Sequence, residues 1–104
     1  MLLGIHHAAI ICSDYQKSKH FYVTILGLSV LAEHYREARQ SYKLDLQLPD
    51  KSQIELFSFD NPPKRPSYPE ACGLRHLAFR VESIETAIEH LTAHDIAVEP
   101  VRID

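Results

Sequence analysis

The amino-acid sequence predicts an α+β fold of paired β-α-β-β-β modules, the second of them truncated. Three observations lead to this prediction: an alternating apolar pattern in the first half, a proline-rich segment after it, and a second start of the same pattern. Module one covers about residues 1–60, the linker residues 61–73, and the incomplete module two residues 74–104. A chain of 104 residues, 45% of them hydrophobic, suits a single domain of this kind.

The first module opens with a strand and a helix. The apolar run from Gly4 to Cys12 is short, as in a buried strand, and the Ser13-Asp14 pair after it is typical of a helix N-cap. Apolar side chains at helical spacing predict a helix from about Tyr15 to Leu26. Gly27 occupies the position of a left-handed C-terminal residue, so the helix is expected to end there.

Three strands are expected to complete this module, over residues 28–35, 41–48 and 53–59. The middle one alternates most clearly, because Tyr42 and each second residue after it are apolar, whereas Lys43, Asp45 and Gln47 are polar. Pro49-Asp50 supplies the turn to the last strand. The sheet is therefore expected to have one apolar and one polar face.

The second module repeats the first after a linker that holds four of the six prolines. Residues 74–81 read as a strand, Ser83 as an N-cap, and the residues after it as an amphipathic helix. His7 and His76 align at an offset of 69 positions, which also places Ser83 on Asp14. A complete second module would extend about 24 residues beyond Asp104, so either the chain has been cut short or its last strands come from elsewhere.

The repeat also relates three potential metal ligands. His7 and His76 lie near the start of equivalent strands, so a two-fold arrangement of the modules would bring them to one shared cleft. Glu55 lies inside a strand, and its side chain is expected on the face opposite to those of its apolar neighbours Ile54 and Leu56. Because an unpaired buried carboxylate is costly, Glu55 either lies on a solvated face, pairs with a cation or binds a metal. Two imidazoles and one carboxylate form an open metal site.

Taken singly, each of these residues has a simpler interpretation, since a lone strand histidine is more often structural. The remaining histidines are interpreted as surface or core residues, and His6, out of phase with His7, is expected on the other face of the strand. Cys12 and Cys72 lack metal-binding spacing and are expected to be small buried side chains without a functional role.

The segment H-A-A-I-I-C-S-D-Y-Q-K-S-K-H-F-Y-V-T-I-L-G-L, beginning at His7, resembles the opening module of the vicinal oxygen chelate superfamily. The segments I-E-L-F and R-H-L-A-F-R-V are similar to the next two metal-ligand strands of that family, and the chain looks closest to its glyoxalase I-like (lactoylglutathione lyase) proteins. This resemblance implies that His7, Glu55 and His76 bind one divalent metal ion, either nickel, cobalt, manganese or zinc.

The resemblance further implies a lyase whose metal holds the two vicinal oxygens of a hemithioacetal. The reaction of this substrate would pass through an enediolate. Glu55 is the matched candidate for the catalytic carboxylate. Two departures concern glutathione: the family's arginine and asparagine positions hold Ile11 and Phe59 here. The family's fourth ligand, a glutamate in the final strand, would lie past Asp104.

Two alternatives come from other functional classes. An extradiol dioxygenase would use two histidines and one glutamate around ferrous iron, although such enzymes usually need additional domains. A protein of the bleomycin-resistance type would sequester a ligand in the same cleft without a metal. Metal analysis separates the second alternative from the enzymes, and oxygen consumption with a catechol identifies the first.

The expected partners are a small-molecule substrate and a second copy of the chain, with neither nucleic acid nor a membrane. A net charge of −3 without a block of basic residues argues against nucleic acid, and no apolar run is long enough to cross a membrane. The start lacks a signal peptide, which predicts a cytoplasmic protein. The incomplete second module favours a homodimer, and the resemblance implies that each site draws His7 and Glu55 from one chain and His76 from the other. Arg36, Arg39 and Lys43 are either solvated or in contact with an anionic substrate.

Overall fold

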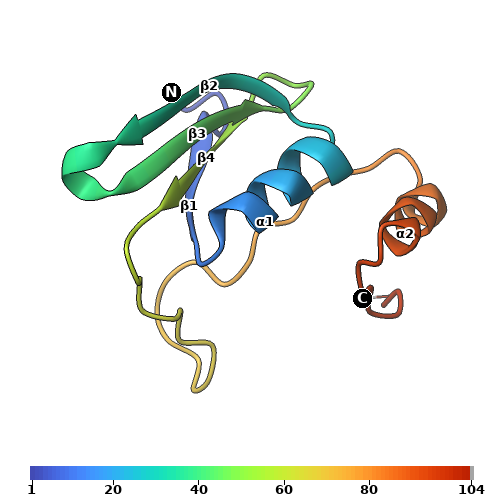
Figure 1. The fold of residues 1–104 in the computed structure, drawn as a ribbon. Helices are drawn as coiled ribbons and strands as arrows, with labels where there is room; N and C mark the ends of the chain where they lie inside the picture. Colours follow the sequence, from blue (N-terminus) through green and yellow to red (C-terminus); the bar gives the residue numbers. More distant parts are fainter. Residues whose placement is uncertain (104) are drawn as a thin grey trace. The chain divides into compact units, whose positions relative to one another are not determined.

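The computed structural model describes residues 1–103, and the chain divides into two compact units, Met1–Arg65 and a second unit that begins at Pro66. The first contains β1 (His7–Cys12), α1 (Tyr15–Lys19), a π-helical segment η1 (His20–Ile25), β2 (Ser29–Arg36), a 3-10 turn η2 (Glu37–Arg39), β3 (Ser41–Gln47) and β4 (Gln53–Ser58) (Figure 1). The second contains α2 (Ile84–Ala93).

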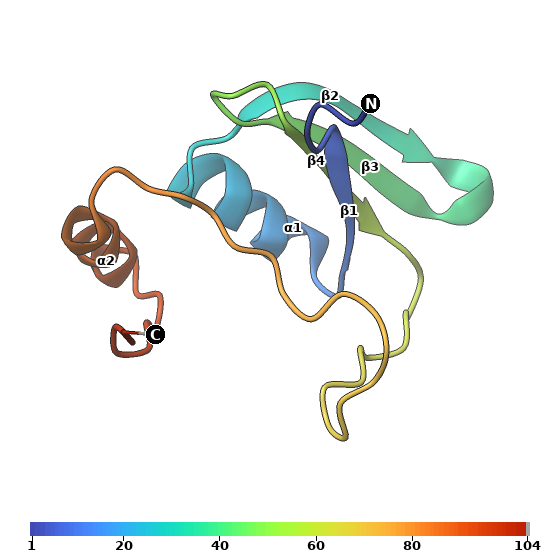
Figure 2. The same cartoon turned by 180° about the vertical axis from the view of Figure 1, so that it is seen from behind.

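The first unit has the predicted β-α-β-β-β order, and the α+β fold class is confirmed. Its strands form one mixed sheet in the order β1-β4-β3-β2. The outer strand β1 runs parallel to β4, whereas β3 is antiparallel to both of its neighbours. Figure 2 shows the sheet from behind, with β1 and β2 at its two edges. The parallel pairing of β1 with β4 joins the first strand of the module to its last.

The core lies between α1 and one face of this sheet. Its fully or nearly buried side chains are Tyr15, Leu44, Leu46, Ile54 and Leu56. The Tyr15 ring also stacks on Tyr42 at a centroid distance of 4.4 Å. Because side chains alternate along a strand, burial of this apolar face leaves Lys43, Asp45 and Glu55 on the opposite, polar face. The predicted alternation is thus observed in β3.

The predicted first helix begins and ends as expected but changes its hydrogen bonding midway. The Asp14 carboxylate caps it by accepting a hydrogen bond from the Lys17 backbone N–H at 3.1 Å. In η1 the Leu26 N–H donates to the Phe21 carbonyl, five residues back, and Gly27 ends the segment with a φ of 77°. The spacing of apolar side chains does not distinguish this wider π-type turn from an α-helical one.

The second unit confirms the predicted helix but not the predicted strand. The Ser83 side chain caps α2 by accepting a hydrogen bond from the Thr86 N–H at 3.2 Å. Residues 74–81 pair with no strand among residues 1–103, and Leu77, Phe79 and Val81 are 40%, 40% and 48% exposed. A strand exists only where a partner satisfies its backbone, which a local pattern cannot supply. No helix in the described part of the chain has the length and apolar character to cross a bilayer.

A candidate metal centre on the polar face of the sheet

The register of three strands brings titratable side chains together on the polar face. Glu55 in β4 lies opposite Ala9 in β1 and opposite Asp45 in β3. His7 is two residues before Ala9 and therefore shares its face, and Lys43 likewise shares the face of Asp45. Neighbouring strands are about 4.8 Å apart, so these four side chains form one continuous group.

His7 and Glu55, two of the three predicted ligands, lie close together. Their Nε2 and Oε1 atoms are 3.8 Å apart, and their side chains are 42% and 20% exposed. This separation is too long for a direct hydrogen bond. An ion bonded to both atoms at about 2.0–2.2 Å would bridge such a gap, since two of these bonds span up to about 4 Å. The imidazole nitrogen and the carboxylate oxygen are therefore candidate ligands of one small divalent ion.

Lys43 approaches the same carboxylate from the other side. Its Nζ lies 2.8 Å from Asp45 Oδ1 and 3.8 Å from Glu55 Oε2. The hydrogen bond to Asp45 raises the lysine pKa above its ordinary value, with a further contribution from the negative charges of Asp45 and Glu55. The charged lysine offsets the repulsion between two carboxylates placed opposite each other. Asp45 is thus the lysine's nearer partner, and Glu55 keeps one oxygen directed toward His7.

His6 does not behave as predicted. Its ring contacts that of His7 edge to face at a centroid distance of 5.1 Å, and the two Nδ1 atoms are 2.8 Å apart. The prediction that His6 lies away from His7 is therefore wrong. β1 begins only at His7, so the side-chain alternation of a strand does not extend to His6. The contact directs His7 Nδ1 toward His6, while His7 Nε2 faces Glu55.

His76, the third predicted ligand, belongs to the second unit, where it is exposed within residues 74–81. Among residues 1–103, no three or more His, Cys, Asp or Glu side chains form a group that could hold a metal ion. The first unit therefore supplies a pair of adjacent candidate ligands, and the role of His76 as a third ligand stays a prediction.

The two cysteines differ in their surroundings. Cys12 is half-buried and its Sγ donates to the Phe57 carbonyl at 3.3 Å. Burial raises the pKa of this thiol. Cys72 is exposed, so the expectation that it is a buried side chain is wrong; it lies within the proline-rich linker, where its described neighbours are exposed as well.

Comparison with known proteins identifies the family of this chain. The family model of the Glyoxalase/Bleomycin resistance protein/Dioxygenase superfamily matches residues 4–103. The uncharacterized protein YwkD of Bacillus subtilis (strain 168) is 58% identical over 104 residues, which are 100% of this chain and 81% of YwkD. The crystal structure of a glyoxalase family protein from Enterococcus faecalis superimposes with a TM-score of 0.89 at 51% identity, over 97% of this chain and 79% of that one.

More distant solved structures share the fold. The glyoxalase I of Leishmania major aligns with a TM-score of 0.75 at 22% identity, covering 98% of this chain and 73% of its own. A mutant of the fosfomycin resistance protein FosX of Listeria monocytogenes, in complex with Mn(II) and 1S,2S-dihydroxypropylphosphonic acid, aligns with a TM-score of 0.74 at 20% identity, covering 99% of this chain and 78% of its own. At these identities the likeness concerns the fold alone.

Proposed function

The chain belongs to the Glyoxalase/Bleomycin resistance protein/Dioxygenase superfamily, and on this basis we propose that it is a metal-dependent lyase or isomerase resembling lactoylglutathione lyase. Its substrate is a small molecule with two neighbouring oxygens. The observation that carries the proposal is the pairing of His7 Nε2 with Glu55 Oε1, 3.8 Å apart on the polar face of the sheet. This is the separation that one divalent ion can bridge.

In this proposal His7, Glu55 and His76 hold the ion. Nickel, cobalt, manganese and zinc all accept imidazole and carboxylate ligands, so the ligand set does not select one of them. Three protein ligands leave positions for water or substrate oxygens. When bound, the ion would polarise the substrate oxygens and so make a neighbouring C–H more acidic. The Mn(II) bound by FosX supports a divalent metal in a protein of this fold.

Glu55 is the proposed catalytic carboxylate. Its Oε1 faces His7, whereas its Oε2 faces the Lys43 ammonium at 3.8 Å. The second oxygen accepts a proton from one substrate carbon and returns it to the neighbouring carbon, which is general base and then general acid catalysis. The hydrogen bond to Asp45 raises the pKa of Lys43, so the lysine remains a cation beside Glu55 Oε2.

Metal content is the first test. The purified protein is expected to contain about one divalent ion per chain and, after removal of the ion with a chelator, to regain activity when nickel, cobalt, manganese or zinc is added. The assay follows isomerisation of hemithioacetals formed by methylglyoxal with glutathione and with a smaller thiol. Because Ile11 and Phe59 occupy the glutathione-binding positions, we expect little preference for glutathione.

Each alternative function has its own outcome in these experiments. A protein that binds no divalent ion would instead support the ligand-sequestering function of the bleomycin-resistance type. Oxygen consumption with a catechol and ferrous iron, without hemithioacetal turnover, would support an extradiol dioxygenase.

His6 is expected to strengthen metal binding by orienting His7. When His6 Nδ1 accepts the Nδ1–H of His7, the lone pair of His7 Nε2 is left to face Glu55 and the ion. We therefore expect His6→Phe to weaken Zn²⁺ binding by about tenfold or more, as loss of such a supporting contact usually does. His6→Gln keeps a side-chain acceptor and should bind nearly as the natural protein does. Calorimetric titration measures both, and equal affinity of all three proteins would remove His6 from the site.

The proposed assembly is a homodimer in which each site draws His7 and Glu55 from one chain and His76 from the other. The apolar side chains of Leu77, Phe79 and Val81 alternate along residues 74–81 and are exposed, and β1 is an edge strand of the sheet. Unpaired edges and apolar alternation favour pairing with another chain. Sedimentation at micromolar concentration is expected to show a dimer. A monomer that still binds one metal ion per chain would exclude the shared site.

A further inference from the structure

Beyond Glu55, the polar face of the sheet carries a cluster of positive charges against aromatic rings. The Arg36 Cζ and the Lys43 Nζ lie 5.6 Å and 6.0 Å from the centroid of the Phe57 ring. The Arg39 Cζ lies 5.2 Å from the Phe59 centroid, and the two phenylalanine rings stack at 6.0 Å. These five residues are called the cationic–aromatic cluster below.

The turn between β2 and β3 builds this cluster. Arg36 is the last residue of β2 and lies opposite Ser41, whose Oγ accepts a weak hydrogen bond from Arg36 Nη2 at 3.5 Å. Gln40 then adopts a left-handed conformation with a φ of 46° and reverses the chain into β3. Lys43 lies opposite Phe57, so the β3–β4 register completes the arrangement. The three cations therefore come from one hairpin, Phe57 comes from the strand beside it, and Phe59 comes from just after that strand.

The charges of the two arginines are not neutralised within the described chain. No carboxylate of residues 1–103 forms an ion pair with Arg36 or Arg39, whereas Lys43 is paired with Asp45. Cation–π contacts orient a guanidinium over a ring but leave its in-plane N–H donors available. Arg36 and Lys43 approach the same ring, where their like charges repel each other. An oxyanion between such groups would accept charge-assisted hydrogen bonds and relieve that repulsion.

We propose that the cationic–aromatic cluster binds an anionic oxygen group of the substrate, a carboxylate or a phosphate. The inference depends on the proposed function, because it gives the substrate class for the same site. Lys43 belongs to both regions, since its Nζ is 3.8 Å from Glu55 Oε2 and 6.0 Å from the Phe57 centroid. One small molecule can therefore contact both. The substrate is a small organic anion whose charged group lies only a few bonds from its two neighbouring oxygens.

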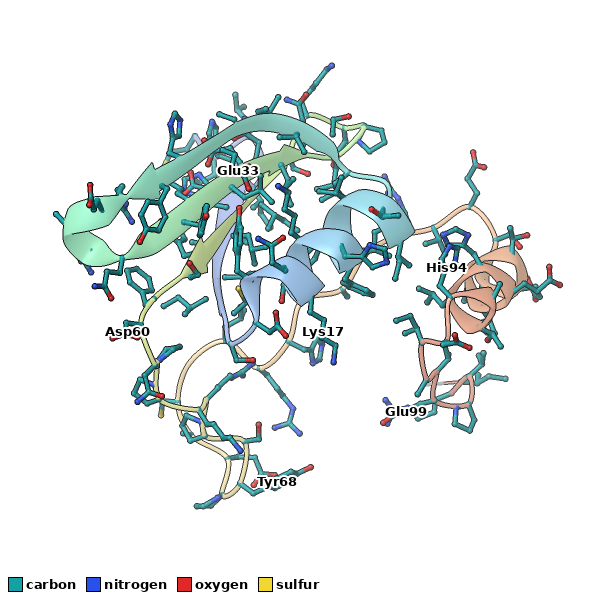
Figure 3. The ribbon with its side chains drawn as sticks, in the orientation of Figure 1. Lys17, Glu33, Asp60, Tyr68, His94 and Glu99 are labelled. Atoms are coloured by element: carbon teal, nitrogen blue, oxygen red, sulfur yellow. The ribbon has the colours of Figure 1, made fainter. Side chains whose placement is uncertain are left out.

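The test uses the metal-free protein, so that anion binding is measured apart from the metal. Inorganic phosphate and lactate are titrated while amide NMR shifts are followed, and saturable shifts are expected at residues 36, 39, 43 and 57. Arg36→Gln should weaken binding of the better probe about tenfold or more, as expected for loss of a charge-assisted donor. Arg39→Gln should weaken it as well. Lys17→Gln, which removes an exposed cation on α1 (Figure 3), should change it less than twofold.

The probe that binds more tightly, phosphate or lactate, identifies the anionic group as a phosphate or a carboxylate. The proposal would be overturned if Arg36→Gln bound the probe as tightly as the natural protein. It would also be overturned if Lys17→Gln weakened probe binding as much as Arg36→Gln does. Either result means that the anion is attracted to surface charge in general. Arg36→Lys, which keeps the charge, should recover part of the affinity. A natural protein that binds phosphate at the cluster but no divalent ion would refute the proposed function alone. Unchanged Zn²⁺ affinity in Arg36→Gln with lost phosphate binding separates the two sites.

Discussion

Replacing His76 by alanine is expected to abolish stoichiometric binding of a divalent ion while leaving the fold intact. His76 is exposed and lies in neither a helix nor a strand of the described chain, so its truncation opens no cavity in a core. Loss of a direct ligand should weaken Zn²⁺ binding more than about hundredfold, since loss of an outer contact to a ligand already costs about tenfold to hundredfold. Calorimetric titration measures the affinity, and circular dichroism monitors the fold.

A histidine outside the proposed site provides the matched control. His20 is exposed at the start of η1, and His20→Ala should bind Zn²⁺ as the natural protein does. If His76→Ala retains full binding, His76 is not a ligand and the metal site lies elsewhere. If both variants lose binding, the titration reports nonspecific contact with surface histidines. The outcome therefore decides whether the second unit contributes a ligand.

The first unit was predictable because its signals are local. An apolar run predicts β1, Asp14 and Gly27 mark the ends of the helix, and the alternation around Lys43 predicts β3 with its polar face. Glu55 was found in the same way, because a carboxylate between two apolar strand residues must lie on the polar face. Each of these inferences uses a few consecutive residues and the fixed geometry of one element.

The remaining features depend on pairing between distant segments. Asp45 was recognised as polar, but only the β3–β4 register places it opposite Glu55. The orientation of the His6 side chain depends on where β1 begins, and the strand begins only at the next residue, His7. The pattern of residues 74–81 predicts a strand, yet a strand also needs a partner whose identity is absent from its own sequence. Register and partner choice depend on residues far apart in the chain, so the local pattern of a sequence does not specify them.

The contacts of three basic residues emerge only from the fold. The sequence left Arg36, Arg39 and Lys43 open between solvated side chains and contacts to an anion. The structure brings all three against Phe57 or Phe59, and one of them, Lys43, also lies 3.8 Å from Glu55 Oε2. Spacing in the sequence gives no indication of this, because Phe57 lies on β4, Phe59 just after its end, and the cations on the preceding hairpin.

Glu55→Gln is expected to remove both metal binding and turnover. Glutamine keeps the shape of the side chain but is a neutral, weaker ligand and cannot serve as a base. Zn²⁺ affinity should fall about hundredfold or more, by the same reasoning as for His76. Activity in the hemithioacetal assay at saturating metal should fall by a further factor of about 100 to 10,000, the usual contribution of a general base. Because Glu55 is partly exposed and beyond hydrogen-bond distance of His7, the fold should tolerate the change.

Asp45→Asn separates the role of Glu55 from that of a nearby negative charge. It removes the ionic partner of Lys43, whose Nζ is already 3.8 Å from Glu55 Oε2. The released lysine can then pair with Glu55 and compete with the metal ion, so Zn²⁺ affinity should fall about tenfold, the effect typical of an outer contact. A second change, Lys43→Met, should restore most of that loss by removing the competitor. If Asp45→Asn instead abolishes binding as completely as Glu55→Gln, and Lys43→Met restores nothing, Asp45 is itself a metal ligand.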